Sequence, residues 1–257
     1  MKKDRRSLIE DLFRKQGEVK LHELEEIFPR YSSMTLRRDL KDLEEEGLVR
    51  RTRGGAIALS KLTLGNEALY QERESYNTTS KIAIAKKAVE FFAAGSSIYI
   101  DAGSSLMYLV KELQDEYCSV LTPGVNIALE LMKKQLPVIT LIGGQLNRNT
   151  VAAAGINSMD FIRSVNIDTA FMGSSGMTLD TGFTCGTYTD CGMKREVLAR
   201  ARKRIILMDS SKYGKSMTFT YAGVDEIDTL ITDKDFPQAA AKALTEKGVS
   251  VIIANNG

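Results

Sequence analysis

The 257-residue sequence has no tryptophan, one histidine and three cysteines. Cys118, Cys185 and Cys191 are odd in number and lack Cys-x-x-Cys spacing, which argues against a disulfide framework and against a zinc module. His22 falls in a stretch with helical apolar spacing, so we interpret it as a surface or packing residue. The chain therefore has no Ser-His-Asp or Cys-His set. We expect no catalytic residue, no metal site and no cofactor.

Long apolar runs are also missing, and none approaches the roughly 20 residues that a membrane helix needs. The start of the chain is basic, but polar Glu10 and Asp11 follow in place of the apolar core of a signal peptide. We therefore expect a cytoplasmic protein without a membrane segment. The apolar fraction of 43% supports packed cores, and the length favours a small domain followed by a larger one.

Three short helices are predicted before residue 47. Apolar residues recur at helical spacing at 8–13 and again at 21–28, where Pro29 ends the second helix. The third helix begins after Ser32, whose hydroxyl can cap the first turn, and it ends at Gly47. Its leucines recur every three or four residues and would face the first two helices. This order is typical of a helix-turn-helix domain.

That burial leaves the start of the third helix facing outward, as in helices that enter the major groove. The candidate DNA contacts on it are Ser33, Met34, Thr35, Arg37 and Arg38. A threonine can contact a base edge or a thymine methyl, and an arginine can bind guanine or a phosphate. The sequence does not tell which arginine would bind a base.

Residues 48–59 form two short β-prone runs around a turn that contains Arg50, Arg51 and Arg53. Such a hairpin, or wing, would place cations along the DNA backbone. Each basic cluster alone would favour a solvated surface. In this order after three helices, the clusters together favour a winged helix-turn-helix domain over residues 1–59 that binds double-stranded operator DNA.

The run from Thr35 to Leu40, followed by Gly47-Leu48-Val49, Arg51 and Gly54-Gly55-Ala56, resembles the DNA-binding domain of DeoR-type bacterial repressors. In that family, Thr-Ile-Arg-Arg-Asp-Leu opens the recognition helix and a His-Gly-Gly-Ala wing follows. Leu36 replaces the isoleucine here, and Arg53 replaces the histidine. Arg53 keeps or increases positive charge on the wing.

Residues 60–78 are polar and are interpreted as a linker, and residues 79–257 alternate between strand and helix patterns. This alternation predicts an α/β domain with a mostly parallel, helix-covered sheet. The predicted strands cover 97–100, 119–121, 138–142, 168–172, 204–208, 229–231 and 249–253. The predicted helices cover a segment from Lys81 that ends at Gly95, a segment through Leu113, 125–134, 190–203 and 237–247.

Ligands of parallel sheets bind at the carboxyl ends of strands, where this chain has several small and polar loops. The loop 101–105 follows a strand and precedes a helix, so its glycine, its two hydroxyls and the N–H groups of the helix start suit a phosphate. Gly-Ser-Ser is also a common turn, and the loop matches neither a P-loop nor a dinucleotide-binding turn. The candidate effector-binding residues are Asp101, Gly103, Ser104, Ser105, Gly143, Gly144, Gly173, Ser175, Gly176, Lys194 and Lys212.

The same loops, in the same order and followed by Ile231-Thr232-Asp233, resemble the sensor domain of DeoR-type repressors. The resemblance implies a fold related to ribose-5-phosphate isomerase and a phosphorylated sugar as effector. It also implies that Lys194 and Lys212 add positive charge to the bound phosphate. Pro123-Gly124 and Gly192 depart from the family pattern near the expected ligand rim.

Three hypotheses follow for function. The favoured one is a repressor of a carbohydrate-utilisation operon that binds DNA as a homo-oligomer, dimer or tetramer, and responds to a phosphorylated sugar. An isomerase-like enzyme would need a carboxylate near the substrate carbon, for which Asp101, Asp180 and Asp190 are candidates. An adaptor that binds only proteins would also suit residues 60–257. The arginine wing favours the regulator over the enzyme, because an enzyme has no use for it.

Overall fold

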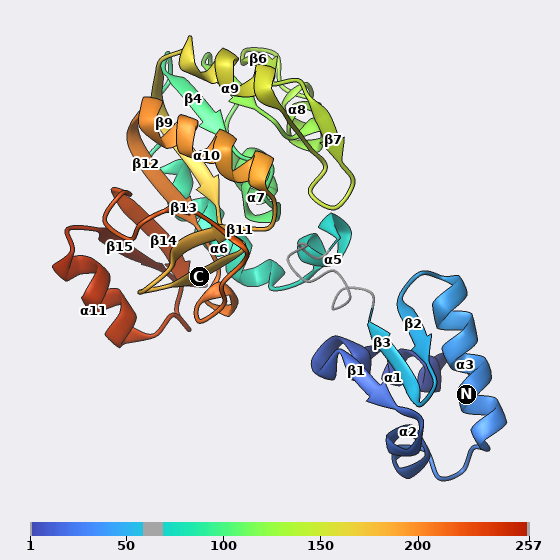
Figure 1. Ribbon diagram of the computed structural model, residues 1–257. Coiled ribbons are helices and arrows are strands. Elements are labelled where there is room, and N and C mark those ends of the chain that lie inside the picture. The colour runs from blue at the N-terminus through green and yellow to red at the C-terminus, as the bar shows by residue number, and fades with distance from the viewer. Residues whose placement is uncertain (1, 59–68, 256–257) are drawn as a thin grey trace. The chain divides into compact units, whose positions relative to one another are not determined.

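The computed structural model describes residues 2–58 and 69–255, which divide into two compact units (Figure 1). The first unit is Met1–Asn66 and the second is Glu67–Gly257. Residue 59 of the predicted wing and residues 60–68 of the expected linker lie outside the described residues. Each unit has a hydrophobic core of its own, so each is described separately.

In its described residues, the first unit contains three helices, α1 (Lys2–Gln16), α2 (Leu21–Ile27) and α3 (Ser33–Glu45). Ser32 caps α3 as predicted, because its hydroxyl oxygen accepts the backbone N–H of Thr35 at 3.3 Å. The leucines of α3 pack with the first two helices around a core of Ile9, Phe13, Leu24, Leu36, Leu40 and Leu43.

A three-stranded antiparallel sheet completes this unit in the order β1-β3-β2. The wing strands are β2 (Val49–Thr52) and β3 (Gly55–Ala58), and the short β1 (Glu18–Lys20) was not predicted from the sequence. Gly55 lies so close to β1 that a Cβ atom there would be 2.2 Å from the carbonyl oxygen of Val19. The glycine of the wing is therefore required by the pairing of β3 with β1.

A buried ion pair joins α1 to α3. Arg5 contacts Asp39 through two hydrogen bonds, Nε to Oδ2 at 2.6 Å and Nη2 to Oδ1 at 2.9 Å. The guanidinium also lies 4.1 Å from the ring centre of Tyr31. Because Asp39 sits beside Arg37 and Arg38, this pair fixes the helix that carries the predicted DNA contacts.

The second unit is built on a seven-stranded sheet in the order β15-β14-β12-β9-β4-β5-β6, in which all neighbours are parallel. Its strands are β4 (Ser97–Ile100), β5 (Ser119–Thr122), β6 (Val138–Leu141), β9 (Ile167–Gly173), β12 (Ala201–Leu207), β14 (Thr229–Asp233) and β15 (Ser250–Ala254). The predicted fold class, a winged helix-turn-helix domain followed by an α/β domain with a mostly parallel sheet, is confirmed.

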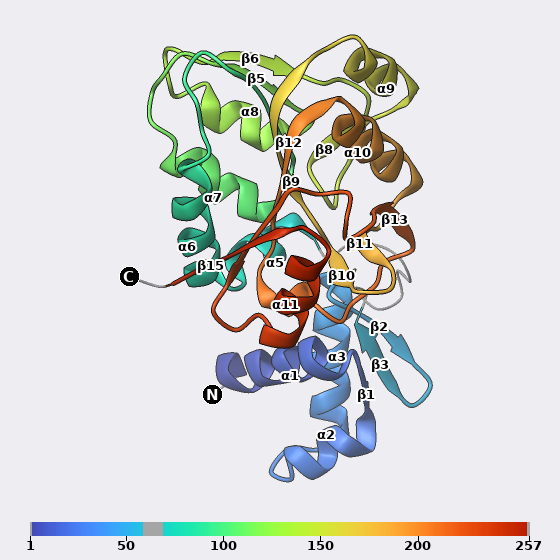
Figure 2. The same ribbon diagram turned by 90° about the vertical axis from the view of Figure 1, so that its left-hand side faces the viewer.

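Helices cover both faces of this sheet (Figures 1 and 2). One face carries α6 (Thr78–Val89), α7 (Ser104–Glu112) and α8 (Val125–Leu131). The other carries α9 (Ile156–Arg163), α10 (Tyr188–Arg200) and α11 (Gln238–Glu246). Alternate residues of the central strands enter the two cores: Phe171 faces α6 and α7, and Met172 faces α10.

Smaller elements decorate the strand ends. They are α5 (Tyr70–Ser75), the hairpin of β7 (Gln145–Asn147) and β8 (Ala152–Ala154), and a second sheet of β10 (Gly176–Thr178), β11 (Gly182–Cys185) and β13 (Phe219–Ala222). A 3-10 turn covers Ser210–Lys212. The sequence patterns did not predict these strands, because most have only three or four residues.

Three predicted helix ends are corrected. The helix expected at 125–134 ends at Leu131, and Met132 is its C-cap residue. The helix expected at 190–203 ends at Arg200, because Ala201 already pairs with Ile167 of the central strand β9. The helix expected to reach Gly95 ends at Val89, where Phe91 and Phe92 donate to carbonyls three residues earlier in a tightened turn.

We predict that Asp39→Ala lowers the free energy of unfolding of the first unit by about 3–5 kcal/mol, because it leaves Arg5 buried without its partner. Denaturant unfolding of the full chain measures this loss. Glu45→Ala is the matched control on the same helix: it removes an exposed ion pair with Lys41 and should cost less than about 1 kcal/mol. Equal losses for the two variants would contradict the prediction.

Candidate functional site

The start of α3 presents the predicted DNA contacts to solvent. Ser33, Met34, Arg37 and Arg38 are exposed and occupy one side of the helix. Thr35 is only half-buried, and its hydroxyl lies 3.0 Å from that of Ser32, so it takes part in the N-cap. The outward side of α3 therefore carries two arginines and two uncharged side chains that can reach a groove.

The wing and α3 share a hollow of about 360 Å³ that Arg37, Arg51 and Arg53 line. Arg51 differs from the other wing arginines because its Nε donates to Glu44 of α3 at 2.6 Å. This hydrogen bond lowers the pKa of Glu44. Arg50 and Arg53 are exposed. Arg51 therefore anchors the wing to α3, and the other two present their charges outward.

The second unit has a cavity at the point where the strand order reverses. From β4 the chain runs outward through β5 and β6 and then returns to β9 on the other side of β4. The cavity lies at the ends of β4, β9 and β12, which is the position where parallel sheets bind ligands. Its residues include Asp101, Gly103, Ser104, Ser105, Gly173, Ser174, Ser175, Asp190, Lys194, Asp209 and Lys212.

The amino end of α7 forms one wall of this cavity. Gly103 is the N-cap residue, and no side chain caps the helix. The first N–H groups of a helix have no partner within it, and the helix dipole makes this end positive. Ser104 and Ser105 are buried here and add two hydroxyls. This wall can therefore donate several hydrogen bonds to an anion.

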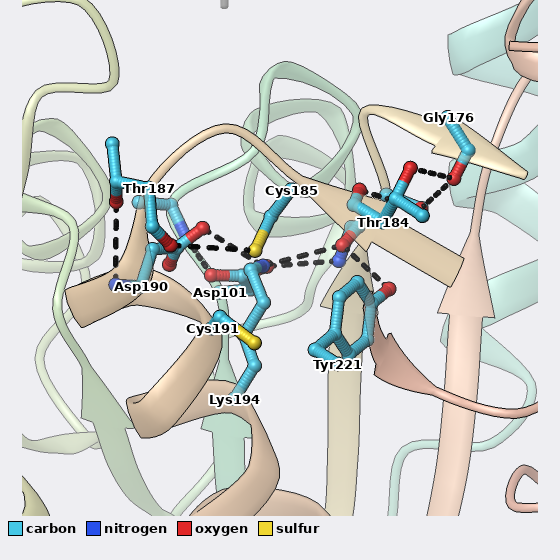
Figure 3. A network of polar contacts seen from close by, with 12 residues as sticks. Asp101, Gly176, Thr184, Cys185, Thr187, Asp190, Cys191, Lys194 and Tyr221 are labelled. Atoms are coloured by element: carbon cyan, nitrogen blue, oxygen red, sulfur yellow. Dashed lines mark hydrogen bonds and ion pairs between the residues drawn. The ribbon is translucent and has the colours of Figure 1, made fainter. Parts of the chain in front are cut away.

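Asp101 holds the floor of the cavity together (Figure 3). One carboxylate oxygen accepts the N–H of Ala102 at 2.9 Å, and the other accepts the N–H of Gly173 at 3.0 Å and a hydrogen bond from Lys194. The Lys194 ammonium also donates to the carbonyl of Gly173 at 3.2 Å and lies 5.2 Å from the ring centre of Tyr221. These contacts join the ends of β4 and β9 to α10.

Burial lowers the pKa of Lys194, but the carboxylates of Asp101 and Asp190 outweigh this effect and hold it well above its usual value. The lysine is therefore charged at neutral pH, and Asp101 compensates its charge inside the protein. Lys194 lines the cavity, and its ammonium is already bonded to a buried carboxylate. Its expected role of adding positive charge to a bound phosphate stays a prediction. The other cations that line the cavity are Lys212 and Arg73.

Three predicted effector-binding residues do not line the cavity. Gly143 and Gly144 follow the edge strand β6, two strands away from β4, and Gly144 packs against the backbone of Ala154. Gly176 belongs to β10, where a Cβ atom would lie 2.6 Å from the carbonyl oxygen of Lys215. The glycine-rich loops therefore do not all meet at one place, because their strands are not all neighbours.

Arg73 was missed, because it belongs to α5 in the segment interpreted as a linker. Its guanidinium donates to the carbonyl of Asn149 at 3.2 Å, and it lines the cavity. Asn77, four residues later, donates to Asp209 at 2.9 Å, and Asp209 also accepts the N–H of Ser211 at 3.1 Å. The segment before α6 is therefore bonded directly to the rim. No local pattern in the sequence signals this contact.

Buried Lys81 fixes the same segment. Its ammonium donates to the backbone carbonyls of Arg73 and Tyr76, and burial lowers its pKa to about 8.

In the part of the chain that the structure describes, no group of three His, Cys, Asp or Glu residues is placed to hold a metal ion. No described helix is long and apolar enough to cross a membrane.

The fold and the two sites define a class of protein: a winged helix-turn-helix DNA-binding unit joined in one chain to an α/β unit with a ligand cavity. Residues 5–61 match the family model of the DeoR-like helix-turn-helix domain, and residues 76–234 match that of the DeoR C-terminal sensor domain. The chain belongs to the DeoR family of helix-turn-helix transcriptional regulators. This confirms the expectation of a regulator over that of an isomerase-like enzyme.

Named relatives agree with this assignment. The chain is 32% identical to the transcriptional regulator GlpR of Haloferax volcanii, over 86% of each protein. It is 31% identical to the transcriptional repressor GlcR of Bacillus subtilis, over 85% of this chain and 84% of the relative. Ribose-5-phosphate isomerase A of Neisseria gonorrhoeae is 18% identical over 53% of each chain, with a TM-score of 0.38, which is too low to define a shared fold or activity.

We predict that Arg37→Ala or Arg38→Ala weakens DNA binding, as measured by fluorescence anisotropy with the DNA upstream of the gene. An arginine bonded to guanine should cost about 1–3 kcal/mol on the specific site alone. A phosphate contact should instead weaken binding to every sequence and reduce its salt dependence. Arg202→Ala, an exposed arginine of the second unit, is the control and should change nothing. Full binding by both Arg37→Ala and Arg38→Ala would exclude α3 as the recognition helix.

Proposed function

We propose that this protein is a repressor of a carbohydrate-utilisation operon, and that a phosphorylated sugar bound in the cavity of the second unit changes its affinity for operator DNA. The observation that carries the proposal is the uncapped amino end of α7, with buried Ser104 and Ser105, at the reversal point of the sheet. Hydrogen-bond donors concentrated in this way suit a phosphoryl group.

The size of the cavity supports the same ligand. Its volume is about 50 Å³. That volume corresponds to roughly four water molecules at about 10–15 Å³ each. A phosphoryl group fits such a space. The sugar would therefore lie toward the rim, where Arg73, Asp190 and Lys212 can distinguish one hydroxyl pattern from another.

The position of α5 offers a route from the cavity to DNA binding. A ligand changes DNA affinity only if it favours one arrangement of the chain over another. Arg73 lines the cavity on α5, which directly follows the segment that leads from the DNA-binding unit. A bound anion would hold Arg73, and with it the start of the second unit, in one position. We also propose that the protein acts as a homo-oligomer, because helix-turn-helix proteins read paired half-sites.

A ligand screen tests the proposed function. The full chain is mixed with phosphorylated sugars and with the same sugars lacking phosphate, and thermal stability and binding to its upstream DNA are recorded. At least one phosphorylated sugar should raise the melting temperature and change DNA affinity, while its unphosphorylated form does neither. If no phosphorylated sugar has either effect, the proposal is wrong.

We predict that replacing Ser104 and Ser105 together with leucine abolishes the response to the phosphorylated sugar and leaves DNA binding intact, because the leucines fill the cavity and remove two hydroxyls. Anisotropy with and without the sugar measures both properties. The matched control is Gly143→Ala, in a loop that the sequence also suggested. A Cβ atom at Gly143 has nothing within 4 Å, so this variant should respond normally. Retained response in the leucine variant would refute the site.

We predict that Arg73→Gln weakens binding of the phosphorylated sugar by about 10- to 100-fold, since a hydrogen bond to a charged group contributes about 1.5–3 kcal/mol. Calorimetric titration of the full chain measures the affinity. Lys111→Gln, which removes a half-exposed cation from the other end of α7, should bind as the wild type does. Equal affinities for all three proteins would show that Arg73 does not contact the ligand.

A further inference from the structure

One edge of the large sheet carries a concentration of exposed apolar side chains. Among the described residues, strand β6 ends the sheet and pairs only with β5. Six large apolar side chains lie on β6, at the neighbouring α8, in the turn between them and on β7. Each of them is between 47% and 68% exposed. They form the β6 edge patch: Leu129, Met132, Leu136, Val138, Leu141 and Leu146.

The patch belongs to one region of the second unit. Strand β6 packs beside α8, and in both ribbon views the two lie together at the upper end of the unit, with β6 at its margin (Figures 1 and 2). Leu129 and Met132 are three residues apart and share the outer side of α8. Soluble monomers rarely expose a contiguous apolar surface of more than a few hundred Å² unless it has a function.

The arrangement on β6 indicates how a partner would bind. Val138 and Leu141 are an odd number of residues apart, so they point to opposite faces of the sheet. Both are about half exposed. A partner that lies on one face would cover only one of them. A partner that adds a strand along the edge would cover both and would pair the outward backbone groups of β6.

The opposite edge of the same sheet is protected in the way that edge strands usually are. On β15 the most exposed large apolar side chain is Ile253, which is 38% exposed. The neighbouring α11 presents the ion pair of Lys242 and Glu246 to solvent. Natural sheets use charged neighbours of this kind to prevent edge pairing. Beside β6, the ion pair of Glu130 with Lys133 is accompanied by a larger number of exposed apolar side chains.

We infer that the β6 edge patch is the interface with a second copy of this chain, in which two β6 strands pair antiparallel about a twofold axis perpendicular to the sheet. With such an axis, the sheet face that carries α8 points the same way in both copies. The two α8 helices then lie on the same face, where Leu129, Met132 and Leu141 of both copies can meet. An isologous contact of this kind closes after two subunits.

The area of the patch fits this occupant. Six large side chains at about half exposure present on the order of 300 Å² of apolar surface per copy. A standard interface buries roughly 800 Å² per partner, of which somewhat over half is apolar. The patch therefore supplies most of the apolar area that a stable dimer needs. The edge backbone and the adjacent ion pair of Glu130 with Lys133 would supply the polar remainder.

This inference rests on the homo-oligomer of the proposed function and names its interface, and it is independent of the effector.

The test is the mass of the full chain, measured by light scattering across a concentration series. The wild type should show a mass of two chains or a multiple of two. The double variant Met132→Glu/Val138→Glu should halve that mass, because it buries four carboxylates at the contact. Its circular dichroism and its binding of the phosphorylated sugar should match the wild type. Ile253→Glu, on the other edge strand, is the matched control and should keep the wild-type mass.

Cross-linking gives a second measurement that does not depend on disrupting the interface. The native Cys118, Cys185 and Cys191 are all buried, so the background reaction is low. Val138→Cys should give covalent dimers with a short bismaleimide, and Ile253→Cys should not. A monomeric wild type would overturn the homo-oligomer itself. A wild-type dimer that the double variant leaves unchanged, with no cross-link from Val138→Cys, would overturn only this interface and point to a different partner for the patch.

Discussion

The buried contact between Asp101 and Lys194 is the constraint on which the ligand-binding unit depends. An ionised carboxylate inside a protein loses several kcal/mol of hydration unless partners replace the water. Asp101 obtains those partners from three places: its own loop, the N–H of Gly173 at the end of β9, and Lys194 on α10. Strands β4 and β9 are neighbours in the sheet, although β5 and β6 come between them in the chain. The contacts of Asp101 hold these two strands at a fixed spacing, and the cavity forms between the loops that follow them.

The same pair determines which charges remain for a ligand. Asp101 and Lys194 largely compensate each other, and Asp190 at 4.0 Å from the ammonium adds a negative charge. In the proposed function, attraction for the ligand comes mainly from the amino end of α7 and from the cations Arg73 and Lys212 that line the cavity. That function requires a ligand that carries its negative charge on one end.

Much of this arrangement was predictable from the sequence, and the exceptions have a common cause. Ser104 and Ser105 were identified because strand, glycine and helix start are adjacent in the chain. Gly143 follows a strand in the same way, yet it lies away from the cavity, because β6 is an edge strand and strand order is not encoded locally. Arg73 was missed for the converse reason: it reaches the cavity from a distant segment. Local patterns predict elements and loops, whereas the sheet order decides which loops meet.

The DNA-binding unit is internally fixed, which limits how a signal can act on it. The pair of Arg5 with Asp39 fastens α3 to α1, and the pair of Arg51 with Glu44 fastens the wing to α3. A ligand bound in another unit is therefore not expected to reshape the recognition surface. It can instead change where two such surfaces are held, and operator binding by a dimer depends on the spacing of its half-sites. The hydrogen bond of Asn77 with Asp209 lies where the second unit begins. In the proposed function, a contact of Arg73 with the ligand would act at the same place, and it would alter that spacing without altering either DNA-binding surface.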